Sequence, residues 1–215
     1  MKISLNWLAD YIDDAPLRAD LKGVLSTLTL RGLEVESIED LAKGFDKVIV
    51  AQIETRDRHP NADRLSVCKV NTGKEVLQIV CGAQNMKAGD KIVLSQIGAH
   101  LPNGLKIEKG KIRDVESFGM LCSETELGLA DTSEGILILP PTAKVGEPVA
   151  DFLGRNDIVF TLNVTPNRGD ALSHIGVARE LAAILGQVIK LPSTDLVAAE
   201  QVATKSADKV SVAVE

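Results

Sequence analysis

Short runs of aliphatic and β-branched residues recur through the middle of the chain. Residues that favour turns, such as Asn, Asp, Gly and Pro, separate these runs, as is typical of strands joined by tight connections. The runs cover residues 48–53, 65–70, 76–80, 91–97 and 136–139. Five short strands within about 100 residues predict a small closed or partly open barrel, for which the OB-fold is the five-stranded candidate.

The segments on either side of this block have a different pattern. Before it, apolar residues recur three or four apart over residues 17–28 and then alternate over residues 33–38, which predicts a helix followed by a strand. After it, residues 158–164 alternate as a strand, and residues 172–185 have one apolar helical face. Trp7 is predicted to fill the core beneath the N-terminal helices.

An all-β block between two pieces of similar mixed character predicts an inserted domain. The expected fold class is therefore α+β, with a five-stranded OB-type β-barrel inserted into a discontinuous mixed α/β domain. We place the barrel at residues 43–151 and the discontinuous domain at residues 1–42 and 152–190, with its two predicted strands paired. For residues 191–215 we expect a polar, Ala-rich linker and then the start of a missing following domain.

Charge is distributed unevenly between these segments. The net charge is −6, of which −4 falls in residues 1–42, −1 in residues 43–151 and −1 in residues 152–215. An acidic total weighs against a nucleic-acid-binding protein, which usually carries a basic excess, but the middle block is close to neutral. Aromatic residues make up only 3% of the chain, which disfavours single-strand binders that stack bases on aromatic side chains.

Motifs for catalysis do not occur in the sequence. There is no phosphate loop, no Gly-x-Gly-x-x-Gly and no Gly-x-Ser-x-Gly. The three cysteines form no Cys-x-x-Cys pair, which disfavours a zinc ribbon or a disulfide framework and suits a reducing cytoplasm. We therefore predict no catalytic residue, no metal site and no cofactor within this chain.

Two groups of residues around histidines have a chemical and a structural interpretation. His59 and Asp63 are four apart and could share a helix face as metal ligands, but turn-forming residues lie between them and a metal needs three or four ligands, so a turn is favoured. Ser173 and His174 follow Asp170 closely, yet neighbouring helical side chains point apart. Helix capping by Asp170 or Ser173 is therefore favoured over a catalytic triad.

One charge pattern has a functional and a structural interpretation. Lys109, Lys111 and Arg113, which we call the basic strip, alternate with Gly110 and Ile112, so on a strand the three cations would lie along one face. Such local positive potential is what contacts to a nucleic-acid backbone require. The alternative is a solvated strand edge whose lysines discourage edge-to-edge pairing, and the charge pattern alone favours that alternative.

Several segments resemble the tRNA-binding OB domain attached to several aminoacyl-tRNA synthetases. These segments are residues 59–65 (HPNADRL), 79–85 (IVCGAQN), 98–102 (GAHLP), 115–123 (VESFGMLCS) and 126–128 (ELG). The flanks resemble the N-terminal part of the bacterial phenylalanyl-tRNA synthetase beta subunit family. The segments that carry this second resemblance are residues 1–4 (MKIS), 7–8 (WL), 32–35 (GLEV), 164–170 (VTPNRGD) and 176–180 (GVARE).

The resemblance implies a cytoplasmic α2β2 ligase that uses ATP and magnesium to attach phenylalanine to its tRNA, with the catalytic site on the alpha subunit. This chain would be a non-catalytic portion that contributes tRNA binding and assembly and is inactive alone. Its partners would be tRNA and the alpha subunit, and neither DNA nor a membrane. By motif position, the RNA-binding candidates are Asn61, Arg64, Asn85, Lys109, Lys111, Arg113, Ser123 and Glu126.

Each of these assignments has an alternative. Turn chemistry is the alternative for Asn61 and Asn85, and a capping box that opens a short helix is the alternative for Ser123 and Glu126. For the whole chain, the alternatives are a stand-alone tRNA-binding OB-fold protein and a protein–protein spacer module. The chain also departs from the family at Asp114, where glycine is common, which affects local turn shape.

Overall fold

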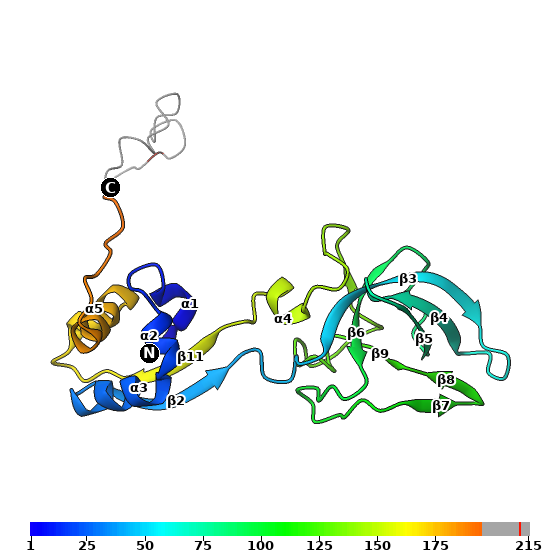
Figure 1. The fold of residues 1–215 in the computed structure, drawn as a ribbon, viewed down its shortest axis with the longest axis horizontal. Helices are drawn as coiled ribbons and strands as arrows, with labels where there is room; N and C mark the ends of the chain where they lie inside the picture. Colours follow the sequence, from blue (N-terminus) through cyan, green and yellow to red (C-terminus); the bar gives the residue numbers. More distant parts are fainter. Residues whose placement is uncertain (195–210, 212–215) are drawn as a thin grey trace. The chain divides into compact units, whose positions relative to one another are not determined.

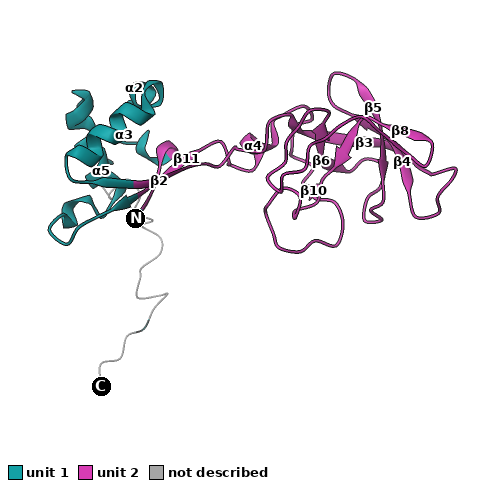
Figure 2. Ribbon diagram, turned by 90° about the horizontal axis from the view of Figure 1, so that it is seen from below, with its two compact units in different colours: residues 1, 7–35, 162–215 teal, residues 2–6, 36–161 magenta. Residues whose placement is uncertain are grey.

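The computed structural model describes residues 1–194 and residue 211, and it divides into two compact units. Among the described residues, the helical unit comprises residue 1, residues 7–35 and residues 162–194, whereas the barrel unit comprises residues 2–6 and 36–161 (Figure 2). The predicted linker and final strand lie largely outside the described residues. No described helix combines the length and the apolar character needed to cross a membrane.

A nearly closed antiparallel sheet forms the centre of the barrel unit (Figure 1). Its strands, in spatial order, are β10 (Ile138–Leu139), β6 (Lys91–Gln96), β3 (Val48–Arg58), β4 (Ser66–Asn71) and β5 (Val76–Cys81), while β9 (Gly119–Leu121) also pairs with β6. Just before β9, the backbone N–H of Phe118 donates to the carbonyl of Gln78 in β5 at 2.9 Å, which brings the far edges together. Each predicted run contains a strand, and the barrel agrees with an OB-type fold.

The long strand β3 contributes to both apolar clusters of the barrel because successive side chains point to opposite faces. Val48 and Val50 pack into one cluster, and Ala51 and Ile53 pack into the other. A register shift after Ile53 follows, and β3 then continues to Arg58, five residues beyond the predicted end. This polar extension of β3 positions the loop that precedes β4.

A two-stranded hairpin separates β6 from β9 along the chain. It consists of β7 (Gly110–Ile112) and β8 (Val115–Ser117). The two residues between these strands, Arg113 and Asp114, have left-handed φ values of 48° and 72°. Two left-handed residues are typical of a type I′ turn, whose twist matches that of the paired strands. The prediction that all three cations of the basic strip share one strand face is therefore wrong, since only Lys111 lies within a strand.

The predicted short helix after Ser123 is also wrong, although its capping contacts form. The backbone N–H of Ser123 donates to the Glu126 carboxylate at 2.6 Å, and the backbone N–H of Glu126 donates to Ser123 Oγ at 3.4 Å. Residues 124–128 nevertheless remain a turn. Gly128 follows with a φ of 63°. A residue in this left-handed conformation typically ends a helix, so the turn does not continue into one.

A three-stranded sheet joins segments from both flanks of the barrel. Its strands, in spatial order, are β1 (Lys2–Ser4), β11 (Ile158–Asn163) and β2 (Glu34–Asp40). Ile3 and Phe160 are antiparallel partners and both side chains are fully buried. The predicted pairing of the two flanking strands is confirmed, whereas β1 is an additional strand that is too short for an alternating pattern to reveal.

The remaining elements are helical. They are α1 (Leu5–Leu8), α2 (Ala15–Ala19), α3 (Leu21–Leu30), α4 (Val149–Phe152), the 3-10 helix η1 (Gly169–Ala171) and α5 (His174–Leu185). Ser173 caps α5 by accepting a hydrogen bond from the backbone N–H of Gly176 at 3.0 Å, so the capping interpretation is confirmed. Trp7 does not fill the core: its side chain is 52% exposed, and its ring stacks on His174 with centroids 3.9 Å apart.

Loss of the α5 cap gives a first prediction. Ser173→Ala leaves a backbone N–H of the first turn without its side-chain acceptor, and we expect the free energy of unfolding to fall by about 1 kcal/mol. Urea unfolding measures this change. The matched control is Ser26→Ala at an exposed position within α3, where alanine favours the helix. Equal stability of the two variants would contradict the assigned cap.

Candidate nucleic-acid interface

The tip of the β7–β8 hairpin lies against the loop between β3 and β4. His59 Nε2 is 3.1 Å from the carbonyl oxygen of Ile112, and the Asn61 side-chain amide donates to the carbonyl of Arg113 at 3.2 Å. In OB-folds, the loop between the first two strands and the loop between the last two strands bind oligonucleotides. The five strands that close the barrel are β3, β4, β5, β6 and β9, while β10 lies at the edge beside β6. The corresponding loops here are the β3–β4 loop and the β6–β9 connection that carries the hairpin, and the two hydrogen bonds bring these loops together.

Hydrogen bonds fix the orientation of His59 within this junction. Its side chain is only 2% exposed, and its Nδ1 accepts a hydrogen bond from the backbone N–H of Asn61 at 3.0 Å. Asp63 instead contacts the guanidinium of Arg58. The turn interpretation of this segment is therefore confirmed. Among the described residues, no group of three or more His, Cys, Asp or Glu side chains could hold a metal ion.

The cations of the basic strip have different partners. Lys109 Nζ lies 2.9 Å from the Glu116 carboxylate and 4.8 Å from the centroid of the Phe118 ring. Lys111 Nζ lies 3.5 Å from the carboxylate of Asp114. Exposed pairs of this kind contribute about 1 kcal/mol at most, so phosphate oxygens can replace these carboxylates.

Two arginines at the junction differ from these lysines in their lack of a carboxylate partner. Neither Arg113, in the hairpin turn, nor Arg64, in the β3–β4 loop, forms an ion pair within the part of the chain that the structure describes. Both side chains belong to exposed residues. These guanidinium groups are thus available to phosphate oxygens without the loss of an existing ion pair, and a guanidinium can bind phosphate through two parallel hydrogen bonds.

The other three nominated residues make contacts inside the barrel unit. Asn85 donates to the carbonyl of Ile136 at 2.9 Å and accepts from its backbone N–H at 3.2 Å. Ser123 Oγ donates to the Glu126 carboxylate at 2.6 Å. These contacts agree with turn chemistry and with a capping box, and they separate this group from the junction formed by Asn61 and Arg113.

Sequence reasoning missed a polar recess beside the β3–β4 loop. The recess has a volume of about 220 Å³ and its lining includes Arg56, Arg58, Asp63 and Gln84. Arg56 is held in place by hydrogen bonds to the Met86 carbonyl at 2.9 Å and to the Gln84 side chain at 2.6 Å. The sequence does contain a sign of this recess: Arg56 and Arg58 are two residues apart directly before the β3–β4 loop, the same spacing as between the cations of the basic strip.

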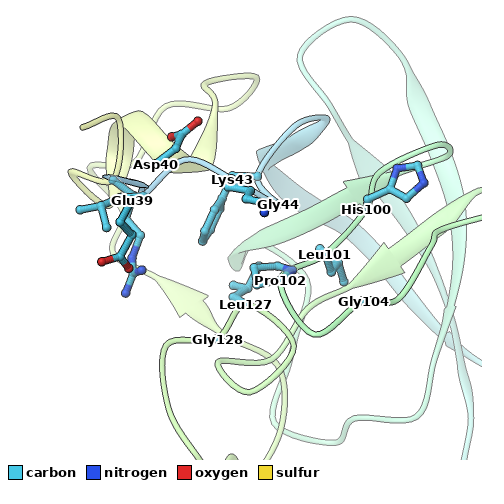
Figure 3. Close-up of a pocket in the computed structure, with 13 residues that line it drawn as sticks. Glu39, Asp40, Lys43, Gly44, His100, Leu101, Pro102, Gly104, Leu127 and Gly128 are labelled. Atoms are coloured by element: carbon cyan, nitrogen blue, oxygen red, sulfur yellow. The ribbon is translucent and has the colours of Figure 1, made fainter. Parts of the chain in front are cut away.

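A larger pocket of about 560 Å³ in the same unit is less suited to a polyanion (Figure 3). Glu39 and Asp40 line it together with Lys43 and Arg155, so charges of both signs meet there. Figure 3 shows His100 on the opposite side of the pocket from Glu39. Because a phosphate backbone would meet these two carboxylates, we place the candidate interface at the hairpin junction instead.

Burial removes the cysteines from consideration as nucleophiles. It raises the pKa of the Cys68 thiol to about 11 and that of the Cys122 thiol to about 12. The pKa of Cys81 is raised as well, again chiefly by burial. A thiol with such a pKa stays protonated at neutral pH, and the thiolate is the reactive form.

Comparisons with known proteins show which proteins this chain resembles. Residues 48–148 match a family model described as a putative tRNA binding domain. The phenylalanine–tRNA ligase beta subunit of Geobacter metallireducens is 54% identical over 190 residues, which are 88% of this chain and 23% of that protein. The beta subunit of Fusobacterium nucleatum is 50% identical over 197 residues, which are 91% of this chain and 24% of that protein.

Among solved structures, a MetRS related protein from Pyrococcus horikoshii aligns with a TM-score of 0.34 and 23% identity, over 46% of this chain and 85% of that chain. The present chain spans about a quarter of the length of the curated relatives that it matches. Those relatives match it across both the barrel and its flanks. The chain is therefore a relative of the phenylalanine–tRNA ligase beta subunit and carries a putative tRNA binding domain at residues 48–148.

Proposed function

We propose that the barrel unit binds the phosphate backbone of tRNA where the β3–β4 loop meets the β7–β8 hairpin. The contacts of His59 with Ile112 and of Asn61 with Arg113 carry this proposal, because they join the two loops with which OB-folds bind oligonucleotides. Arg64 and the basic strip supply the cations. Asn85, Ser123 and Glu126 stay candidates outside this junction.

Within an intact enzyme, this chain acts as the non-catalytic tRNA-binding and assembly portion of a phenylalanine–tRNA ligase beta subunit. We assign the activation of phenylalanine with ATP and magnesium to other parts of a cytoplasmic α2β2 assembly, in which the alpha subunit is the partner of this chain. The sequence, which lacks a nucleotide-binding loop and a nucleophile–base motif, supports this division. The isolated chain is inactive as a ligase.

The charge balance of the hairpin region sets the strength of binding. Residues 106–117 contain four Lys and Arg and three Asp and Glu, which gives a net charge of +1. The net charge of −6 for the whole chain opposes association with RNA. Binding is therefore weak, and it discriminates poorly among tRNAs because phosphate contacts position a protein without reading bases.

Substitution of the basic strip tests this function. Three phosphate contacts give a slope of roughly −2 to −3 in log affinity against log salt, and we expect the triple variant Lys109→Ala, Lys111→Ala, Arg113→Ala to lose most of it. Binding isotherms with a tRNA transcript at two salt concentrations measure the slope. Removal of the facing acids by Asp114→Asn and Glu116→Gln is expected to raise affinity.

A charge-matched control comes from three exposed lysines of the same unit outside the hairpin, Lys74, Lys87 and Lys144, replaced together by alanine. This control changes the net charge by the same amount and is expected to keep the wild-type slope. If the basic-strip variant binds as tightly as wild type with the same slope, the strip only protects a strand edge. Complete absence of tRNA binding by wild type would favour a spacer between proteins.

We also propose that the barrel, residues 43–151, is inserted into a discontinuous domain of residues 1–42 and 152–190. Pairing of β1 with β11 supports this organisation, since these strands come from opposite flanks of the barrel. The backbone N–H of Leu41 donates to the carbonyl of Asp157 at 3.0 Å, so the chain leaves and re-enters the three-stranded sheet at neighbouring points.

A further inference from the structure

The two ring nitrogens of His59 form hydrogen bonds to partners at very different distances along the sequence. Nδ1 accepts from the backbone N–H of Asn61, two residues away, and therefore carries no hydrogen. The ring hydrogen of the neutral imidazole is then on Nε2, which donates to the carbonyl of Ile112, 53 residues away in the sequence. The first bond shapes the local turn, whereas the second ties that turn to the hairpin.

The β7–β8 hairpin is too small to be stable alone, so hydrogen bonds to the rest of the barrel unit must hold it in place. Each of its strands has three residues, and a two-stranded hairpin of this kind is marginally stable by itself. In the middle of β8, the carbonyl of Glu116 accepts a hydrogen bond from the Gln78 side chain at 2.9 Å. At its tip, the contacts of His59 and Asn61 hold the carbonyls of Ile112 and Arg113.

We propose that His59 is a positioning residue for RNA binding, which holds the hairpin tip so that Lys111 and Arg113 face the phosphate backbone together with Arg64. This role rests on the proposed function. Because His59 is buried, this role includes no contact of its own with RNA. By fixing the tip before RNA arrives, it reduces the ordering cost that binding would otherwise include.

Two substitutions at His59 separate its two hydrogen bonds. His59→Asn places an amide near the position of Nδ1, so it keeps an acceptor for Asn61 but does not reach Ile112. His59→Gln places its amide near the position of Nε2, so it keeps a donor to Ile112 and leaves the N–H of Asn61 to water. The pair thus distinguishes a tie between loops from support of one turn.

We expect His59→Asn to weaken tRNA binding about fivefold, as the loss of one hydrogen bond implies, and to make the salt slope shallower by roughly one phosphate contact. His59→Gln is expected to bind as wild type does. A readout without RNA is amide hydrogen exchange at Ile112 and Val115, the cross-strand pair next to the turn, which we expect to accelerate in His59→Asn and not in His59→Gln. Circular dichroism of each variant checks that the barrel is folded.

Other outcomes overturn the proposal in distinct ways. If His59→Asn binds like wild type while the basic-strip variant is weakened, His59 is not a positioning residue but the proposed function stands. If His59→Gln loses as much affinity as His59→Asn, the local turn is the determinant. Should His59→Asn fail to fold, Asn61→Ala provides the test, because it removes the bond to Arg113 and keeps the bond from His59 to Ile112. We expect exchange at Ile112 and Val115 to stay slow in that variant. If exchange there becomes as fast as in an unprotected hairpin, Asn61 and not His59 holds the tip, and the proposal is refuted.

Discussion

Replacement of Gly119 by alanine is expected to lower the free energy of unfolding of the barrel by about 3 kcal/mol or more, as backbone strain and overpacking each cost about 1–3 kcal/mol. Gly119 has a φ of +151°, which side-chain-bearing residues rarely adopt. A Cβ atom there would lie 2.7 Å from the carbonyl oxygen of Ser95 and 3.2 Å from Leu94 Cδ1. The carbonyl belongs to the paired strand β6 and cannot move without a break in the ladder.

The matched control is Gly110→Ala in β7. No atom outside its neighbours lies within 4 Å of a Cβ placed at Gly110. We expect this variant to unfold within about 0.5 kcal/mol of wild type, as is usual for surface substitutions. Chemical denaturation of both variants provides the comparison. Equal midpoints would mean that β9 does not approach β6 as closely as described.

Deletion of the whole barrel is expected to leave a folded remnant, which is the second large effect. We would join residue 42 to residue 152 with a short Gly-Ser linker, because the hydrogen bond between Leu41 and Asp157 places the two ends close together. Phe152 and Leu153 pack against the barrel cluster, so both are replaced by serine to prevent aggregation. Retained helical circular dichroism and a cooperative thermal transition are the expected results.

A second deletion provides the control for that experiment. It removes the barrel together with β11, the central strand of the three-stranded sheet, and we expect it to be unfolded. The isolated barrel, residues 43–151, is expected to fold by itself. If the barrel folds alone but the remnant does not, the flanks do not form one discontinuous domain.

The sequence predicts the strands of the barrel well because each has several residues that are apolar and β-branched. It does not predict β1, β8 and β9, since three residues are too few for a period to be recognised. It also misses the end of β3, where the polar residues from Glu54 onward continue the strand beyond the buried part. Length and burial of a segment therefore decided which strands could be found.

The candidate site shows a similar division. The basic strip and Asn61 could be nominated from their residue types, but their contact could not, because Asn61 and Arg113 are 52 residues apart in the sequence. The turn at Arg113 was missed for a separate reason. The usual signal for a type I′ turn is Asn-Gly or Asp-Gly, whereas this chain has Arg113 and Asp114. Aspartate can adopt the left-handed conformation, but it does so only occasionally, so its presence in a sequence does not predict such a turn.

The stacking of Trp7 on His174 has a spectroscopic consequence. The chain contains one tryptophan and one tyrosine, Trp7 and Tyr11, and both belong to the helical unit. Fluorescence excited in the indole band therefore reports on that unit alone, while the barrel unit is dark at these wavelengths. A half-exposed indole that leaves its imidazole neighbour on unfolding changes its emission, so melting of the helical unit can be recorded separately from the circular dichroism of both units.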